Sequence, residues 1–257
     1  MRWKALLFDV DGTLADTERD GHRPAFNQAF RERGLDWEWD VELYGELLQV
    51  TGGKERMHFY AQHYQPKALL QPDFEALVLQ LHQAKTRFYL QRLQQGGIPL
   101  RPGIKRVLLE ARAQGVLLAV ATTTTLENVT TLLEQTLGPS APSWFQVMAA
   151  GDIVPAKKPA PDIYLWALDR LGLAARDCLA VEDSENGLKA ALGAGLKTLV
   201  TVNDYTRTQD FTGALAVLSD LGEPGAPCQV LAAQSRSAHP TRLPDQGLVD
   251  LAWLERL

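Results

Sequence analysis

Short apolar runs alternate with helical patterns along most of the chain. The runs lie at Ala5–Phe8, Val116–Ala121, Gln146–Ala149, Cys178–Val181, Leu196–Val202 and, with a weaker pattern, Leu215–Leu218. Continuous apolar runs of this length are typical of strands that are buried on both faces of a sheet. Helical patterns lie between them, as at 103–114, 161–171 and 185–193. The alternation predicts an α/β fold, with a Rossmann-like parallel sheet sandwiched by helices.

The stretch from residue 17 to residue 96 has a different pattern. Its helical spacing covers 25–32, 40–48, 54–64 and 73–93, and it contains no convincing strand. Two glycines and a proline at 96–99 then mark a hinge. We therefore expect an α/β core domain made of residues 1–16 and 97–257, with residues 17–96 inserted as an all-helical cap domain. The insertion follows the carboxyl end of the first strand, where open α/β sheets bind their ligands.

The end of the chain has less pattern. Residues 222–246 are rich in Pro, Gly, Ser and Ala, which predicts an irregular loop. Residues 248–257 have the spacing of a short closing helix.

Length and charge limit the class of partner. The chain has 257 residues, enough for one or two domains, and a net charge of −5 without a basic run, so nucleic acid is not an expected partner. No apolar run approaches the ~20 residues that cross a bilayer, and the N-terminal run is too short for a signal peptide. The two cysteines do not make a disulfide framework. We expect a cytoplasmic monomer that acts on a small soluble molecule, with no membrane partner.

The first candidate chemistry follows the first strand. Asp9 and Asp11 lie two residues apart, directly after the apolar run. Like charges this close repel each other and resist ionising together, and a divalent cation such as Mg²⁺ removes the conflict because it binds carboxylate oxygens. Gly12 and Thr13 then turn the chain and are expected to offer backbone N–H groups to an anion. A metal, an anion and a carboxylate in one place indicate phosphate chemistry.

Two further clusters suit the same chemistry. Thr122 begins a run of four threonines after the second strand, where a hydroxyl can hold a phosphate oxygen, although threonine also favours strands for its own sake. Lys157 and Lys158 precede a helix, where cations are disfavoured unless an anion faces them. We expect Lys158, beside the rigid Pro159, to face the anion and Lys157 to be solvated.

A second carboxylate pair follows the fourth strand. Glu182 and Asp183 could hold a metal together. Asp183 or Ser184 could instead cap the next helix. The neighbouring Glu182 favours the metal.

These motifs, in this order, resemble those of the haloacid dehalogenase superfamily. The four motifs of that superfamily are matched by Asp9-Val10-Asp11-Gly12-Thr13, Thr122, Lys158 and Glu182-Asp183. The resemblance covers essentially the whole chain, and the helical insertion looks like the superfamily's cap.

The resemblance implies roles for these residues. Asp9 would attack phosphorus and form an aspartyl-phosphate. Asp11 would protonate the leaving alkoxide and then deprotonate the attacking water. Mg²⁺ would be held by a side-chain oxygen of Asp9, the backbone carbonyl of Asp11 and the carboxylate of Asp183, with Glu182 as an indirect or water-mediated partner. Lys158 and the hydroxyls of Thr122 and Thr123 would bind the transferring phosphoryl oxygens.

Candidate substrate residues lie in the cap. Glu18 and His22 are four residues apart on one helix face and could reach a sugar hydroxyl, or could simply form a solvated face. Lys54 and Arg56 follow two glycines near a helix start, where a second anion would account for them; a flexible turn with exposed basic residues is the alternative. Lys85 is a weaker candidate for the same role.

A closer resemblance is to the CbbY branch of the superfamily. It rests on the stretches 21–27, 51–57, 149–152 and 182–188, with Trp37, Trp39 and Asp40. That branch removes one phosphate from xylulose 1,5-bisphosphate, an inhibitory by-product of Rubisco, and releases xylulose 5-phosphate. The resemblance implies that one phosphate meets Asp9 and Mg²⁺ and the other meets basic residues of the cap.

Other functions remain compatible with the sequence. A sugar phosphomutase of the β-phosphoglucomutase type uses the same nucleophile, and a phosphoglycolate phosphatase has less need for Lys54 and Arg56. A dehalogenase is disfavoured, because Asp11 has a clear use only when an oxygen leaving group needs a proton. A non-catalytic binding protein is disfavoured by the intact motif residues.

Overall fold

The structure is a computed structural model that describes residues 2–233 and 247–257. Its contacts divide the chain into two compact units. Unit 1 comprises Met1–Asp16 and Pro99–Leu257, and unit 2 comprises Thr17–Ile98. The chain therefore returns to unit 1 at Pro99, two residues later than the sequence pattern indicated.

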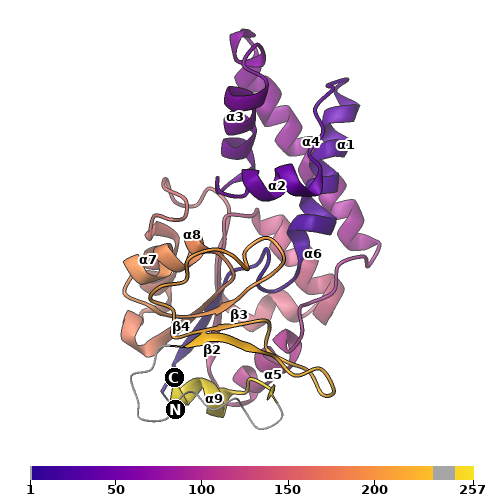
Figure 1. The fold of residues 1–257 in the computed structure, drawn as a ribbon. Helices are drawn as coiled ribbons and strands as arrows, with labels where there is room; N and C mark the ends of the chain where they lie inside the picture. Colours follow the sequence, from indigo (N-terminus) through magenta and orange to yellow (C-terminus); the bar gives the residue numbers. More distant parts are fainter. Residues whose placement is uncertain (1, 234–246) are drawn as a thin grey trace. The chain divides into compact units, whose positions relative to one another are not determined.

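Unit 1 is built on one sheet. Its strands are β1 (Ala5–Phe8), β2 (Leu117–Ala121), β3 (Phe145–Ala149), β4 (Cys178–Glu182), β5 (Lys197–Thr201), β6 (Ala216–Leu218) and β7 (Val230–Ala233). Within the described residues they form a seven-stranded sheet in the order β3-β2-β1-β4-β5-β6-β7 (Figure 1). The pairs from β3 to β6 are parallel, which confirms the predicted α/β fold.

The seventh strand corrects one prediction. β7 pairs antiparallel with β6 and lies inside the stretch predicted to be an irregular loop, of which residues 234–246 fall outside the described part of the chain. Composition alone missed β7 because its pairing depends on a distant edge strand: Val230 lies opposite Leu218.

Helices cover both faces of this sheet. They are α5 (Ile104–Ala113), α6 (Leu126–Leu137), α7 (Asp162–Leu171), α8 (Glu185–Gly193) and α9 (Leu251–Arg256), with short 3-10 helices at Ala141–Trp144 and Ala175–Asp177. One buried cluster joins α7 and α8 to the strand residues Ala5 and Leu7. Successive residues of a strand point to opposite faces of the sheet. Helix α5 does not contribute to the buried cluster of α7 and α8, and it packs against β2 on the opposite face (Figure 1). Helix α6 was not predicted, although Thr125 caps it by accepting from the Asn128 N–H at 3.3 Å.

The register of the strands determines where the site lies. Phe8 is aligned with Val120 of β2 and with Val181 of β4, so these three strands end at the same level. β2 and then β3 lie on one side of β1, whereas β4 and the strands after it lie on the other side, so the strand order reverses at β1. Ligands of open α/β sheets bind beyond the carboxyl ends of the strands at such a point.

The regular secondary structure of unit 2, residues 17–98, is all helical. It contains a π-helix at Glu18–His22, a 3-10 helix at Ala68–Leu70 and the helices α1 (Arg23–Glu32), α2 (Val41–Leu47), α3 (Gly53–Tyr64) and α4 (Phe74–Gln94). Its centre is aromatic: the ring of Trp39 lies 4.7 Å from that of Phe26 and 4.9 Å from that of Phe30, measured between centroids. The Asn27 side chain holds the backbone of Trp39 through two hydrogen bonds of 2.8 Å.

None of the helices among residues 2–233 and 247–257 has the length and apolar character needed to cross a bilayer.

Candidate active site

Asp9 continues β1 into the site. Its N–H donates to the Val181 carbonyl at 3.0 Å, which extends the ladder between β1 and β4 by one residue. The chain then turns at Gly12, whose φ of 86° lies in the left-handed region that favours glycine. The N–H of Gly12 donates to Ala15 at 2.8 Å, and that of Thr13 donates to Val10 at 3.2 Å. The expectation that these two N–H groups bind an anion was therefore wrong, because the turn itself uses them.

Lys158 connects three strand ends. Its Nζ atom donates to Oδ1 of Asp9 at 2.6 Å, to Oε1 of Glu182 at 2.6 Å and to the Ala121 carbonyl at 2.9 Å. The side chain is buried, so the ammonium group makes its three hydrogen bonds inside the protein. Lys158 thus lies against the first carboxylate, and its expected role towards a bound anion stays a prediction.

Lys157 does not behave as predicted. Its side chain is only 13% exposed and forms a 2.8 Å ion pair with Asp152. The expectation of a solvated lysine was wrong because the loop after β3 brings Asp152 to it.

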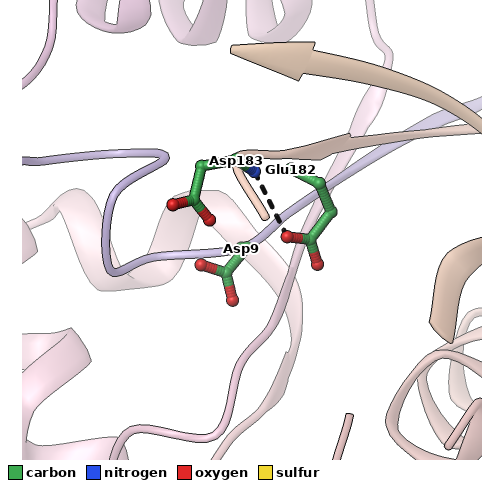
Figure 2. Close-up of side chains that lie close together, drawn as sticks. All are labelled: Asp9, Glu182 and Asp183. Atoms are coloured by element: carbon green, nitrogen blue, oxygen red, sulfur yellow. Dashed lines mark hydrogen bonds between the residues drawn. The ribbon is translucent and has the colours of Figure 1, made fainter. Parts of the chain in front are cut away.

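Three buried carboxylates form the centre of the site. Asp9, Glu182 and Asp183 each offer an oxygen within 4.8 Å of the others (Figure 2). With all three ionised and Lys158 protonated, this cluster would carry two uncompensated negative charges. A hard divalent cation balances that charge and prefers carboxylate ligands. Glycine at position 12 leaves room for the carboxylate of Asp183, because a Cβ atom on Gly12 would stand 2.3 Å from Oδ2 of Asp183.

Burial and crowding perturb these acids. Burial raises the pKa of Asp9 to about 7; Lys158 opposes this change and Glu182 adds to it. Burial also raises the pKa of Asp183 well above its usual range, with Asp9 and Glu182 adding to the effect. Burial alone would lower the pKa of Lys158, but the carboxylates of Asp9 and Glu182 outweigh it and raise that pKa. Such shifts are typical of groups that hold a proton or a metal in a functional site.

Ser184, and not Asp183, caps the helix that follows β4. The hydroxyl of Ser184 accepts from the Gly187 N–H at 3.2 Å and caps α8. The carboxylate of Asp183 instead accepts from the Asn203 side chain at 2.7 Å.

The other predicted residues of unit 1 border this centre. Asp11 is half-buried in the turn. Among the described residues, its side chain is not one of the three clustered carboxylates. Thr122 is buried at the end of β2, where its N–H donates to Ala149 at 2.9 Å and its hydroxyl accepts from the Thr124 N–H at 3.4 Å. Thr123 is half-buried between them.

Sequence reasoning missed residues that hold the centre together, among them Tyr164 and Arg101. The hydroxyl of Tyr164 donates to Oε1 of Glu182 at 2.5 Å. The buried guanidinium of Arg101 donates to the carbonyls of Gly12, Thr201, Val202 and Ser219. Tyr164 lies at a helical position that reads as ordinary core, so its hydroxyl gave no signal. Arg101 precedes the Pro102-Gly103 helix start, and a cation there was the one available hint.

Four of the five cap candidates fall into two groups inside unit 2. Oε2 of Glu18 accepts from the Tyr44 hydroxyl at 2.5 Å, and Arg56 donates to that hydroxyl at 2.9 Å. Arg56 is buried, so the alternative of an exposed basic residue does not apply to it. Tyr44 was not predicted.

The second group surrounds Tyr89. Its ring lies 3.9 Å from that of His22, and Nζ of Lys85 lies 5.4 Å from its centroid and 5.1 Å from that of Phe26. Lys54 lies half-buried in the first turn of α3.

Comparison with known proteins identifies the class. The family described as haloacid dehalogenase-like hydrolase matches residues 3–195, and the chain belongs to this family. Its similarity to CbbY proteins makes it a phosphatase of that family. It is 49% identical over 224 residues to the plasmid-encoded CbbY of Cupriavidus necator, covering 87% of this chain and 88% of that protein.

Solved structures give the same relationship. The crystal structure of CbbY from Rhodobacter sphaeroides in complex with phosphate has a TM-score of 0.79 and 46% identity, covering 87% of this chain and 96% of that one. A mutant of the same protein in complex with xylulose 1,5-bisphosphate has a TM-score of 0.79 and 45% identity over the same shares of the chains. The predicted resemblance, fold class and enzyme class are thereby confirmed.

Proposed function

We propose that the protein is a Mg²⁺-dependent phosphatase that removes one phosphate from xylulose 1,5-bisphosphate and releases xylulose 5-phosphate. The observation that carries the proposal is the similarity over 87% of the chain to a CbbY structure that binds this sugar bisphosphate. The buried carboxylates beside Lys158 support the chemistry, because they combine a nucleophile with a site for a divalent cation.

The reaction starts at Asp9. Oδ1 accepts from Lys158, so we assign the attack on phosphorus to Oδ2. The new bond joins this oxygen to phosphorus while the bond to the sugar oxygen breaks, and Asp11 gives the leaving alkoxide its proton. Asp11 then takes a proton from water as the water oxygen attacks phosphorus. Inorganic phosphate leaves, and the carboxylate of Asp9 is restored.

Other residues stabilise the transferring group. The buried ammonium group of Lys158, held against Asp9, supplies positive charge beside the phosphoryl group, and the hydroxyls of Thr122 and Thr123 bind its oxygens. Mg²⁺, bound by Asp9, Asp183 and the Asp11 carbonyl with Glu182 as an indirect partner, would supply positive charge against the phosphoryl oxygens. Several contributions are needed, since enzymes accelerate such hydrolysis by up to ~10²¹ and one acid–base group supplies only about 10²–10⁴.

Recognition of the sugar and of its second phosphate is assigned to residues of unit 2. Glu18 and His22 are proposed for sugar hydroxyls, and Lys54, Arg56 and Lys85 for the second phosphate. Arg56 and Lys85 are both buried among aromatic side chains, where a cation is held in one place.

The experiment is a comparison of phosphate release from xylulose 1,5-bisphosphate, ribulose 1,5-bisphosphate, glucose phosphates and phosphoglycolate. We expect the highest kcat/KM on xylulose 1,5-bisphosphate, and no turnover in excess EDTA or after Asp9→Asn. Asp169→Asn, an exposed position on α7, is the matched control and keeps turnover. Equal or greater turnover on phosphoglycolate would contradict the substrate, and isomerised sugar phosphate without free phosphate would identify a phosphomutase.

A further inference from the structure

Asn203 follows β5 and contacts one of the carboxylates of the site. Its Nδ2 atom donates to Oδ2 of Asp183 at 2.7 Å. The sequence analysis gave this residue no role, and it lies 20 positions from its partner. The contact links the loop after β5 to the carboxylate pair after β4.

The local turn determines which end of the amide faces Asp183. Oδ1 of Asn203 accepts from the Tyr205 N–H at 2.9 Å. The Asn203 N–H donates to the Thr206 hydroxyl at 3.0 Å, and its carbonyl accepts from the Thr206 N–H at 3.2 Å and the Arg207 N–H at 3.1 Å. A flipped amide would turn its NH₂ group towards the Tyr205 N–H and its oxygen towards a carboxylate. Both contacts would be repulsive, so the donor is held on Asp183.

The turn after Asp9 lies against the hydrogen-bonded side chains of Asn203 and Asp183. A Cβ atom on Gly12 would stand 2.3 Å from Oδ2 of Asp183 and 2.6 Å from Nδ2 of Asn203. The glycine therefore lies directly against this hydrogen bond. Figure 2 shows the carboxylate of Asp183 directed towards Asp9. With Oδ2 engaged by the amide, Oδ1 is the oxygen that we assign to a metal.

We propose that Asn203 is a positioning residue that holds the Asp183 carboxylate in the orientation a divalent cation requires. The inference rests on the proposed use of Mg²⁺. Groups that orient metal-binding carboxylates act through the metal affinity, and their removal typically weakens binding by 10–100-fold. The hydrogen bonds described for Asn203 go to Asp183 and to its own turn, so its effect should appear first in metal binding.

The test measures Mn²⁺ binding to the metal-free full-length protein by electron paramagnetic resonance. Asn203→Ser keeps an oxygen that can accept from the Tyr205 N–H but is too short to reach Asp183. Thr206→Val is the matched control, since it removes a hydrogen bond from the same turn and leaves the amide in place. We expect Asn203→Ser to raise the Kd for Mn²⁺ at least about tenfold and Thr206→Val to change it less than about twofold. Asn203→Thr is a second variant with the same expectation if the serine variant does not fold.

The outcomes separate this inference from the proposed function. Unchanged Mn²⁺ binding in Asn203→Ser, or equal weakening in Thr206→Val, would overturn the role of the amide while leaving the phosphatase mechanism intact. A wild-type protein that binds no Mn²⁺ would overturn both. The KM for the sugar phosphate at saturating Mg²⁺ is expected to stay unchanged in Asn203→Ser, which a general disturbance of the site would not allow.

Discussion

Gly187 lies directly against the carboxylate of Glu182. A Cβ atom on Gly187 would stand 1.9 Å from Oε2 and 2.2 Å from Cδ of Glu182. The carboxylate cannot move aside easily, because Oε1 accepts from Lys158 at 2.6 Å and from Tyr164 at 2.5 Å. The first turn of α8 therefore needs glycine at this position because of what lies opposite, and not because of its own backbone angles.

Replacing that glycine should damage the site through packing alone. We expect Gly187→Ala to lower the free energy of unfolding by about 1–3 kcal/mol, the usual cost of overpacking, and to reduce turnover because Glu182 and Lys158 must shift. Urea denaturation and steady-state kinetics measure the two effects. Gly97→Ala is the control, since the nearest atom to its Cβ would be 3.9 Å away. An alanine variant at 187 with wild-type stability and turnover would contradict the argument.

Replacement by methionine should have very different effects at Lys157 and at Lys158. Lys158→Met leaves two buried carboxylates without their shared cation, so we expect a loss of about 3–5 kcal/mol in unfolding free energy and a loss of turnover. Lys157→Met breaks an ion pair whose Asp152 side chain is 59% exposed, and we expect a cost of at most about 1 kcal/mol.

Thermal or urea denaturation of both variants, with activity measured in parallel, makes the comparison. Equal destabilisation by the two substitutions would show that burial of the Lys158 ion pairs does not control stability here.

The strand pattern could be predicted because burial on both faces leaves a continuous apolar run, as in Ala5–Phe8. Parallel alignment then brought the ends of distant strands together, so the motif residues Asp9, Lys158 and Asp183 could be expected at one edge. Local sequence order was largely sufficient for this step, since Asp9 and Asp183 directly follow β1 and β4 and Lys158 lies in the loop after β3.

The remaining contacts depend on tertiary structure that local pattern does not encode. Tyr164 and Asn203 reach the carboxylates from elements far along the chain, and neither has a distinctive neighbour in sequence. The pairing of Lys157 with Asp152 depends on how one loop folds. β7 depends on the free edge of β6. In each case the deciding partner is a side chain or strand edge brought close by the fold.

Arg101 should control the catalytic turn through hydrogen bonds to backbone carbonyls. Its guanidinium donates to Gly12 at 2.5 Å, Thr201 at 2.9 Å, Val202 at 2.5 Å and Ser219 at 2.8 Å. A lysine has three N–H donors on one atom and cannot satisfy four carbonyls in this arrangement. We expect Arg101→Lys to cost about 1–3 kcal/mol for a buried carbonyl left unpaired, and to lower kcat because the turn after Asp9 loosens.

Arg106 provides a matched control for this substitution. It donates to the carbonyls of Val249, Leu221 and Gly222 at 2.6 to 2.9 Å, and none of these belongs to the carboxylate site. Arg106→Lys should lower stability by no more than Arg101→Lys, because a lysine has three N–H donors for these three carbonyls, and it should leave kcat near the wild-type value. If both variants lose kcat in proportion to their stability, Arg101 has no specific effect on the turn.

Protons and metal should compete for Asp9. Its pKa in the metal-free protein is raised from 3.8 to about 7, chiefly by burial. The folded protein therefore holds a proton in this range that the unfolded chain has released, so the contribution of Asp9 to stability is present at acid pH and is lost as pH rises through about 7. Mg²⁺ binds the deprotonated carboxylate, so its affinity should rise as the pH increases through about 7.

The increase in Tm caused by Mg²⁺ over EDTA measures this competition. It should grow as the pH rises from about 5 through about 7, because below the pKa each bound cation must first displace a proton from Asp9. Asp9→Asn cannot titrate and should lose this part of the dependence, whereas Asp169→Asn should keep it. A Mg²⁺-induced Tm increase that does not vary with pH would mean that Asp9 carries no proton that the metal has to displace.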